Sequence, residues 1–290
     1  MREKMGDLAT LASRAAMGWH AQARRDRGRK RMDLGLRGKT ALITGGSKGI
    51  GRAAAESLAA EGCGVILVAR TASALDAAAE EIRGRFQVNV RAHAADIAVQ
   101  GTAEELARLF PAIDILVNNA GAIPGGSLPQ VDGTTWRNAW QLKVFGYIDM
   151  CRAFYPLLAQ RSGVIVNVIG NAAATLDPAY ICGVAGNAAL EAFTRSLGGG
   201  APADGMRVVG LSPGPVATDR LVTLTRKKAA DRFGDPERWR DLLAAMPFGR
   251  AATPQEIGDM VAFLASTRSG YTSGTIVQID GGMASRSRAF

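Results

Sequence analysis

The stretch ALITGGSKGIG, residues 41–51, decides the fold of this chain. Its first four residues form a short apolar run, and Gly45, Gly49 and Gly51 follow where a helical stretch begins. Glycines at such a point let the backbone turn tightly and approach a pyrophosphate, whose charge is stabilised by amides and dipole at a helix N-terminus. The spacing is GxxxGxG rather than the more common GxGxxG, so this turn alone is a weak indicator of a nucleotide site.

The rest of the chain repeats an alternation of short apolar runs and amphipathic stretches. The apolar runs predict strands over residues 41–44, 65–69, 90–94, 114–118, 164–168, 207–211 and 275–279. The stretches between them predict helices over residues 50–60, 72–83, 103–109, 133–159, 185–197 and 254–265. Continuous Val, Ile and Leu runs are typical of strands that helices cover on both faces. The pattern predicts a doubly wound α/β fold of Rossmann type, a single domain over residues 32–290 with a parallel sheet of about seven strands flanked by helices.

The charge of the chain is concentrated at one end. The 290 residues carry a formal net charge of +9, a balance typical of proteins that bind nucleic acids or membrane surfaces. Residues 1–31, however, hold nine basic and three acidic side chains, which account for six of these charges. No aromatic residue that could stack on a base interleaves the basic run at 24–31. We therefore expect a disordered basic extension rather than a nucleic-acid partner.

The cysteines and histidines exclude several kinds of site. Cys63, Cys151 and Cys182 are far apart and odd in number, so they predict neither disulfides nor a zinc site, and they fit a reducing cytoplasm. With only His20 and His93, a catalytic or metal-binding histidine cluster is excluded, and no metal is expected. No apolar run approaches the roughly 20 residues of a membrane-spanning helix, so no membrane partner is expected.

Five motifs, in their order along the chain, make residues 32–290 resemble the short-chain dehydrogenase/reductase family. They are TGGSKGIG at 44–51, Asp96 after the third expected strand, NNAG at 118–121, PGPVAT at 213–218 and SGTIVQIDGG at 273–282. The resemblance implies a nicotinamide dinucleotide, a small-molecule substrate, and a homodimer or homotetramer packed through the helices at 133–159 and 181–197. It assigns the cofactor to Gly45, Ser47, Lys48, Gly49, Ile50, Gly51, Asp96, Ile97, Asn119, Ala120, Gly121, Asn187, Pro213, Gly214, Val216 and Thr218.

The end of the second expected strand selects between NAD(H) and NADP(H). An acidic side chain there accepts a hydrogen bond from the ribose 2′-hydroxyl of NAD, whereas a basic one accommodates the 2′-phosphate of NADP. This chain has Arg70 at that point and Lys48 inside the glycine turn, with no repelling carboxylate expected beside them. We therefore expect NADP(H); the alternative is that Arg70 is only a solvated residue at a strand end.

The resemblance fails at the four positions that carry the family's chemistry. The family uses a tyrosine as proton donor or acceptor, a lysine four residues later, a serine about one strand earlier and an asparagine on the preceding helix. A tyrosine with the ordinary pKa of about 10 is a poor base at neutral pH until a nearby cation stabilises its phenolate. Aligning the helix at 188–197 places Gly183 at the tyrosine, Asn187 at the lysine, Gly170 at the serine and Lys143 at the asparagine.

Two interpretations of this loss stay open. In the first, neighbouring residues rebuild the site of an oxidoreductase that acts on a carbonyl or an alcohol: Tyr180 supplies the phenol, Lys143 the cation and Asn171 a hydrogen-bond donor. In the second, Tyr180 is a packing residue and a carboxylate or the cofactor neutralises Lys143. The protein then binds NADP without dehydrogenase activity, as a sensor or a structural component. Taking Tyr180 as the family tyrosine would shift the following helix by three residues and disrupt its apolar face.

Residues 219–247 are expected to form the lid over the substrate, as in the family. Arg220, Arg226, Lys227 and Lys228 lie near its start, and such cations would suit an anionic substrate. Four acidic residues follow within the segment, so a solvated helix face is the simpler interpretation of the same pattern.

Overall fold

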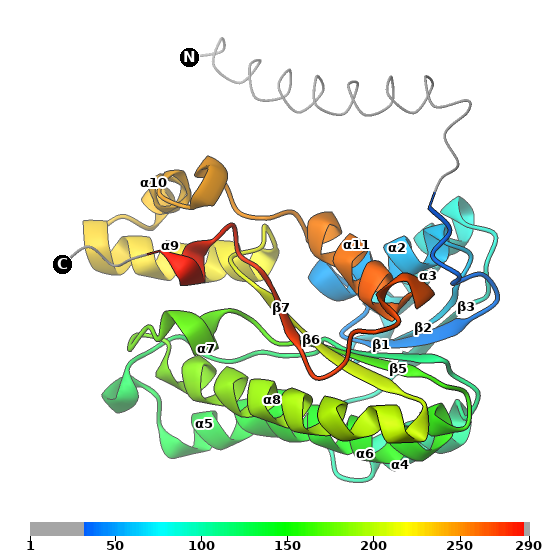
Figure 1. Cartoon of the computed structure of the whole chain (residues 1–290). Coiled ribbons are helices and arrows are strands. Elements are labelled where there is room, and N and C mark those ends of the chain that lie inside the picture. The colour runs from blue at the N-terminus through cyan, green and yellow to red at the C-terminus, as the bar shows by residue number, and fades with distance from the viewer. Residues whose placement is uncertain (1–31, 287–290) are drawn as a thin grey trace. The chain divides into compact units, whose positions relative to one another are not determined.

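One sheet of seven parallel strands forms the centre of the chain in the computed structural model, which describes residues 32–286 (Figure 1). The strand order is β3-β2-β1-β4-β5-β6-β7. The strands span β1 Thr40–Thr44, β2 Gly64–Ala69, β3 Val90–Ala94, β4 Ile115–Asn118, β5 Val164–Val168, β6 Arg207–Pro213 and β7 Ile276–Ile279. The disordered extension expected at residues 1–31 lies outside the described residues.

The doubly wound topology is confirmed. In β1, Ala41 lies opposite Val65 of β2 on one side and Ile115 of β4 on the other. The chain thus winds from β1 outward to β3, returns beside β1 as β4, and winds outward to β7. In such sheets the reversal of strand order opens a crevice at the carboxyl ends of the strands, where ligands bind.

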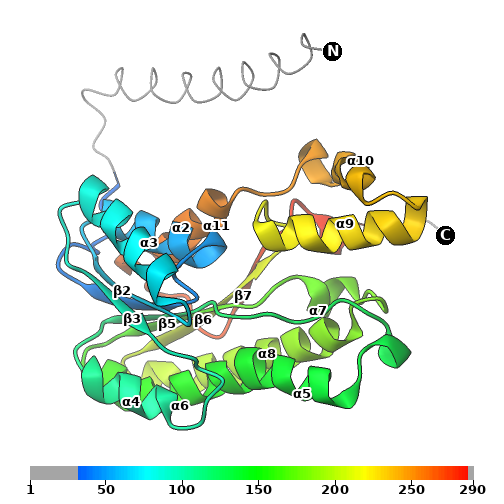
Figure 2. The ribbon, with the colours of Figure 1, turned by 180° about the vertical axis from the view of Figure 1, so that it is seen from behind.

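Helices cover both faces of the sheet, as Figures 1 and 2 show from opposite sides. One layer contains α2 Gly49–Ala60, α3 Ala72–Arg85 and α11 Pro254–Ala265, and the other α4 Thr102–Leu109, α5 Gly133–Trp140, α6 Gly146–Ala159 and α8 Ile181–Gly200. Buried Leu58 and Ile257 belong to the core under the first layer, and buried Leu106 and Phe154 to the core under the second. Apolar burial on both faces explains the uninterrupted aliphatic runs of the strands.

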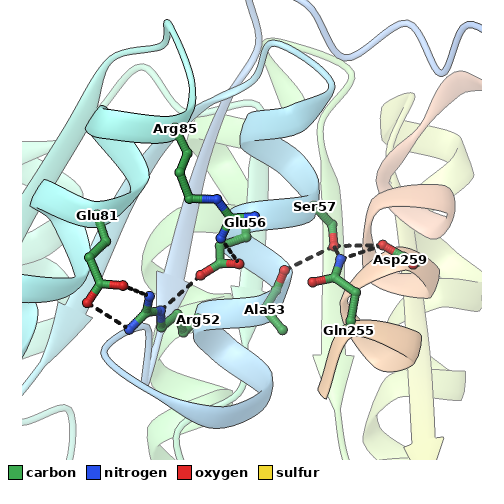
Figure 3. A network of polar contacts seen from close by, with 8 residues as sticks. All are labelled: Arg52, Ala53, Glu56, Ser57, Glu81, Arg85, Gln255 and Asp259. Carbon is green, nitrogen blue, oxygen red and sulfur yellow. Dashed lines mark hydrogen bonds and ion pairs between the residues drawn. The ribbon is translucent and has the colours of Figure 1, made fainter. Parts of the chain in front are cut away.

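Helix α2, which follows the glycine turn, is held against α11 by close packing and polar contacts (Figure 3). A Cβ atom at Gly258 would lie 2.6 Å from the Ala53 carbonyl, so only glycine permits this approach of the two helices. The Ser57 hydroxyl accepts a hydrogen bond from Gln255 Nε2 at 2.7 Å and donates to Asp259 Oδ1 at 2.9 Å.

On its other side, α2 is joined to α3 by ion pairs (Figure 3). Arg52 donates to Glu56 at 2.9 Å and also pairs with Glu81 of α3, while Arg85 of α3 pairs with Glu56 at 2.7 Å. These contacts from both neighbours fix α2, and with it the N-terminus that follows the glycine turn.

The prediction of one continuous α-helix over residues 133–159 is wrong at residues 141–145. Between α5 and α6 lies a π-helical turn, Gln141–Phe145, in which the Gly146 N–H donates to the Gln141 carbonyl five residues back. A Cβ atom at Gly146 would lie 3.2 Å from Ile97 Cδ1, so the turn lies tightly against the neighbouring loop. Such turns widen a helix by one residue and are frequent at functional sites. Lys143 lies inside this one.

The segment expected to form the lid is helical. Residues 219–247 contain α9 Asp219–Phe233, a 3₁₀ turn at Pro236–Arg240 and α10 Asp241–Ala244. A short helix, α7 Ala172–Thr175, precedes α8. Within residues 32–286, no helix has the length and apolar character needed to cross a membrane.

Candidate active site

A cleft of about 1140 Å³ lies at the carboxyl ends of the strands. It brings together nearly all the residues that the sequence assigns to cofactor and chemistry. Its lining includes Gly45, Ser47, Lys48, Gly49, Ile50, Arg70, Asp96, Ile97, Asn119, Ala120, Gly121, Lys143, Gly170, Asn171, Tyr180, Asn187, Pro213, Gly214, Val216 and Thr218. Gly51 and Gly183 do not line the cleft. At both positions the absence of a side chain leaves room for neighbouring atoms of the chain. No group of three or more His, Cys, Asp or Glu residues suited to a metal ion occurs in the described part of the chain.

The glycine turn between β1 and α2 has the backbone that its sequence predicts. Gly45 and Gly49 have φ angles of 68° and 58°, values that favour glycine. A Cβ atom at Gly51 would lie 2.3 Å from the Gly45 carbonyl oxygen, so the third glycine allows the turn to close on the helix. Asn119 holds the turn from the end of β4, because its Nδ2 donates to the carbonyls of Thr44 at 3.0 Å and Gly45 at 3.3 Å.

The residues around this turn fit the pyrophosphate of a dinucleotide. Lys48 is the N-cap of α2, and no side chain in the described structure caps that helix end. The first N–H groups of a helix have no partner within the helix, so here they remain for a ligand or solvent. The Asn119 amide occupies the space beside Gly45 and Gly51. Gly45 and Gly49 line the cleft without side chains, so a phosphate can approach their backbone.

Arg70 and Lys48 both line the cleft and are exposed, but the expectation that no carboxylate lies beside them is wrong. Asp96 Oδ2 is 3.9 Å from Arg70 Nη1, because β2 and β3 are neighbours in the sheet and their ends meet. The Arg70 side chain is 67% exposed, so this is a weak ion pair in high dielectric. A phosphate bound at Arg70 would have to compete with it.

Lys143 reaches from the π-helical turn to the end of β5. Its Nζ donates to the Ile169 carbonyl at 2.7 Å and to the Val168 carbonyl at 3.3 Å. Nζ also lies 5.5 Å from the centroid of the Tyr147 ring, and the aliphatic stem passes so close to Gly121 that a Cβ there would be 2.6 Å from Lys143 Cδ. The amine is therefore held at a defined point of the cleft wall.

No carboxylate of residues 32–286 lies within ion-pair distance of Lys143, so the alternative in which a carboxylate of the chain neutralises it is wrong. Burial of the amine and, as the smaller cause, the positive charge of Arg220 together lower the pKa of Lys143 to about 7. Charged and neutral forms are thus both accessible near neutral pH, which is what a group that holds and releases a proton requires.

The ring of Tyr180 occupies the space that a side chain at position 183 would need. A Cβ atom on Gly183 would lie 2.0 Å from Tyr180 Cε1 and 2.3 Å from Cζ. Tyr180 is the N-cap residue of α8, three residues before Gly183, and it packs against an apolar cluster that includes Trp140 and Cys182. Among residues 32–286 its hydroxyl has no hydrogen-bond partner, and the side chain lines the cleft.

Gly170 and Asn187, which the sequence predicts at the family's serine and lysine positions, contact each other. Gly170 has a φ of 127°, and its carbonyl accepts a hydrogen bond from Asn187 Nδ2 at 3.3 Å. Asn187 is only 4% exposed, and its Oδ1 has no partner in the described structure. A buried acceptor without a donor is costly, so a hydroxyl or water on the cleft side would satisfy it.

Asn171 lies in the cleft wall, but its amide points toward the C-terminal segment. Nδ2 is 3.5 Å from Asp280 Oδ2 and 3.6 Å from Met283 Sδ, and the backbone N–H donates to the Pro213 carbonyl. The Asn171 side chain therefore links the loop after β5 to the segment after β7.

One residue of the site was not assigned to it from the sequence. Arg220, in the first turn of α9, donates to the Ile123 carbonyl in the loop after β4, and its charge acts on the Lys143 amine. The sequence shows Arg220 only as one of four cations near the start of the lid. Nothing in their spacing distinguishes the one that crosses the cleft.

Comparison with known proteins identifies the fold family. The model of the family described as Enoyl-(Acyl carrier protein) reductase matches residues 45–284. The chain belongs to the short-chain dehydrogenase/reductase family. The resemblance drawn from the five motifs is thereby confirmed, and this family membership supports a nicotinamide cofactor in the cleft.

Three relatives illustrate what this short-chain dehydrogenase/reductase is similar to. Galactitol 2-dehydrogenase (L-tagatose-forming) of Cereibacter sphaeroides is 34% identical over 251 residues, 85% of this chain and 95% of that protein. L-sorbose reductase from Gluconobacter frateurii, complexed with NADPH and L-sorbose, has a TM-score of 0.80 and 31% identity. The match covers 88% of this chain and 100% of the reductase chain. An NADPH-bound short-chain oxidoreductase from Pseudomonas aeruginosa PAO1 is described as containing an atypical catalytic center. It has a TM-score of 0.76 and 31% identity, and the match covers 87% of this chain and 98% of the oxidoreductase chain.

Proposed function

We propose that this protein is an NADP(H)-dependent oxidoreductase that interconverts a carbonyl and an alcohol with a rebuilt proton-transfer site. The observation that carries the proposal is the place of the Tyr180 ring. It fills the space directly above Gly183, where the family's tyrosine side chain would begin. The Tyr180 ring therefore starts from the turn before α8 and lies against the helix position that the family's tyrosine would occupy, and Tyr180 lines the cleft.

The proposed roles rest on the chemistry of the two side chains and on their shared place in the wall of the cleft. A bound nicotinamide would supply or remove the hydride. In the reducing direction, the Tyr180 hydroxyl gives its proton to the substrate oxygen as the carbonyl becomes an alcohol. Lys143 in its ammonium form stabilises the resulting phenolate and returns a proton, and its pKa of about 7 suits both tasks at neutral pH. The carbonyls of Val168 and Ile169 keep the amine in place throughout.

The proposed preference for NADP(H) rests on Arg70 and Lys48, both exposed at the dinucleotide end of the cleft. A guanidinium and an ammonium together offer charge-assisted hydrogen bonds to a 2′-phosphate, and the bound phosphate would displace Asp96 from its weak pair with Arg70. The NADPH named for two structural neighbours supports the same choice. We also propose a homodimer or homotetramer through α5, α6 and α8, where Phe145 is 47% exposed, and a cytoplasmic location, since all three cysteines are free.

The alternative function is NADP binding without dehydrogenase activity. It is favoured by Asn187, an uncharged amide in place of the family's lysine, and by the engagement of Asn171 with Asp280. The two functions share the cofactor and differ only in turnover. A substrate panel separates them, and L-sorbose, L-tagatose and a 3-oxoacyl thioester are its natural first members because relatives act on such compounds.

The decisive experiment compares Tyr180→Phe and Lys143→Met with the wild type in NADPH-dependent reduction of that panel. We expect kcat to fall about 100-fold or more in each variant, the range of general acid and base catalysis, while NADPH affinity changes little. Tyr155→Phe is the matched control, since the Tyr155 hydroxyl of α6 donates to Asp204 in the 3₁₀ turn after α8, and Tyr155 does not line the cleft. Turnover that survives in both site variants would refute the roles given to them.

A further inference from the structure

The lid contacts the opposite side of the cleft through charged side chains, and the one whose charge acts on Lys143 is Arg220. Its guanidinium comes from the first turn of α9 and donates to the Ile123 carbonyl in the loop after β4. Two further contacts keep α9 above the cleft: Lys228 pairs with Asp177 at 3.7 Å, and Leu224 lies beside Gly125. Arg220 is thus anchored at the part of the cleft that contains Lys143, and it is also exposed to solvent.

Two of the other cations near the start of the lid have carboxylate partners, whereas Lys227, an exposed residue that also lines the cleft, has none in the part of the chain that the structure describes. Arg226 pairs with Glu237 at 3.2 Å, and Lys228 with Asp177. Among residues 32–286, no carboxylate lies within 4.0 Å of Arg220, whose one hydrogen bond to a protein acceptor uses one of five guanidinium donors. Four donors remain, in the fork that matches a carboxylate in two parallel hydrogen bonds.

Arg220 and Lys143 face the same space without a negative charge between them. The charge of Arg220 disfavours the ammonium form of Lys143, whereas no carboxylate in the described structure acts on that amine in the opposite direction. Asp219 and Asp231 also line the cleft, but both are exposed and neither pairs with Arg220. Two cations held close together without a counter-ion create a site that an anion would stabilise.

We propose that the substrate is an oxo acid or hydroxy acid whose carboxylate is bound by Arg220 beside Lys143. This inference rests on the proposed function, because the bound acid is the compound whose carbonyl or alcohol reacts. The single guanidinium and the single amine match one negative charge. They lack the glycine turn that suits a phosphate at the other end of the cleft, and the N-terminus of α9 beside them is capped by the Thr218 side chain, unlike that of α2. Arg220 is then a specificity-determining residue that orients the substrate.

The first test uses pairs that differ only in charge: pyruvate, acetoacetate and levulinate, each beside its methyl ester, with NADPH and the full chain. We expect at least one acid to be reduced with a kcat/KM well above that of its ester. Arg220→Gln should lower this preference about 10- to 100-fold, mainly through KM, because it keeps a donor for the Ile123 carbonyl but removes the charge. Arg226→Met, on the same helix but paired with Glu237, should leave the preference unchanged.

The second test measures binding without turnover. Calorimetric titration of malonate into the NADPH-saturated protein should show binding that weakens with salt, and Arg220→Gln should weaken it at least 10-fold while Arg226→Met does not. If malonate does not bind, or if the esters are reduced as well as the acids, the inference is overturned while the proposed oxidoreductase stands. If malonate binds through Arg220 but no carbonyl compound is reduced, the carboxylate site stands and the proposed function fails.

Discussion

The two halves of the cleft are built in different ways. The dinucleotide half is made by backbone: positive φ angles at Gly45 and Gly49, the missing Cβ of Gly51 and an uncapped helix end. The chemical half is made by side chains that converge from separate elements, Lys143 from a π-helical turn and Tyr180 from the turn before α8. Backbone geometry allows few substitutions, whereas a functional group can be supplied from a neighbouring position. This difference would allow a chain to keep the family's cofactor motifs while changing its four catalytic positions, as the sequence of this chain predicts.

The largest expected effect concerns the buried amine in the chemical half. Because the pKa of Lys143 is about 7 when folded and about 10.4 in an unfolded chain, the unfolded state binds one more proton between these values. The free energy of unfolding of the wild type, relative to Lys143→Met, should therefore rise with pH by about 3 kcal/mol from pH ~7 to ~10 and level off below ~7. Urea unfolding of both proteins at several pH values measures this difference. A difference that does not vary with pH would contradict the burial of an unpaired amine.

The next prediction concerns a substitution that disrupts the glycine turn in the dinucleotide half of the cleft. Gly51→Ala would place a Cβ 2.3 Å from the Gly45 carbonyl and 2.4 Å from Asn119 Nδ2, so we expect it to lower the free energy of unfolding by about 2 kcal/mol and to weaken cofactor binding. Gly84→Ala in α3 is the control, because no atom lies within 4 Å of its added Cβ. There alanine should raise stability by up to about 1 kcal/mol through helix propensity. Equal effects of the two substitutions would mean that the turn is not closely packed.

A third prediction sharpens the role of the Tyr180 ring. Gly183→Ala adds a Cβ 2.0 Å from Tyr180 Cε1, so the ring must move away from the position proposed for catalysis. We expect turnover to fall about 10-fold with little change in NADPH affinity, since a small misplacement of a catalytic group is enough for such a loss. In a Tyr180→Ala background the same substitution should have almost no further effect on kcat. A full 10-fold loss in that background would show that Gly183 acts independently of the ring.

The smallest expected effect lies at the exposed end of the cofactor site. Arg70→Ala removes a side chain that is 67% exposed and weakly paired, so we expect about a fivefold loss of NADPH affinity and none of NADH affinity. Fluorescence titration with both nucleotides measures the ratio. If both affinities fall together, Arg70 supports the strand end rather than the 2′-phosphate.

Much of the fold could be predicted from the sequence, because its signals are local. Apolar runs marked all seven strands to within a few residues, and α11 begins and ends where the pattern places it. The π-helical turn at 141–145 was not predicted, since it adds a single residue and the chain is helical on both sides of it. It lies where Gly146 closely approaches Ile97, a residue distant in the chain.

In the candidate site, too, local features were predicted and contacts between distant segments were not. The glycine spacing and the motifs after the strands placed the cofactor residues in one cleft, since parallel strands end at one edge of the sheet. The carboxylate beside Arg70 was missed, because the pairing of β2 with β3 brings Asp96 there. The charge of Arg220 beside Lys143 was missed as well, since the path of a lid over a cleft depends on packing between distant segments.

The sequence by itself determined a doubly wound sheet and a glycine turn before α2, and it predicted the loss of the family's four catalytic residues. The sheet and the turn depend on residue type and on short spacings along the chain, where backbone geometry acts directly. Only the tertiary structure decided that the Tyr180 ring fills the space above Gly183, that Lys143 donates to the end of β5 without a carboxylate partner, and that Arg220 crosses the cleft. Such contacts join elements far apart in sequence, and their energies exist only once the helices and strands have packed.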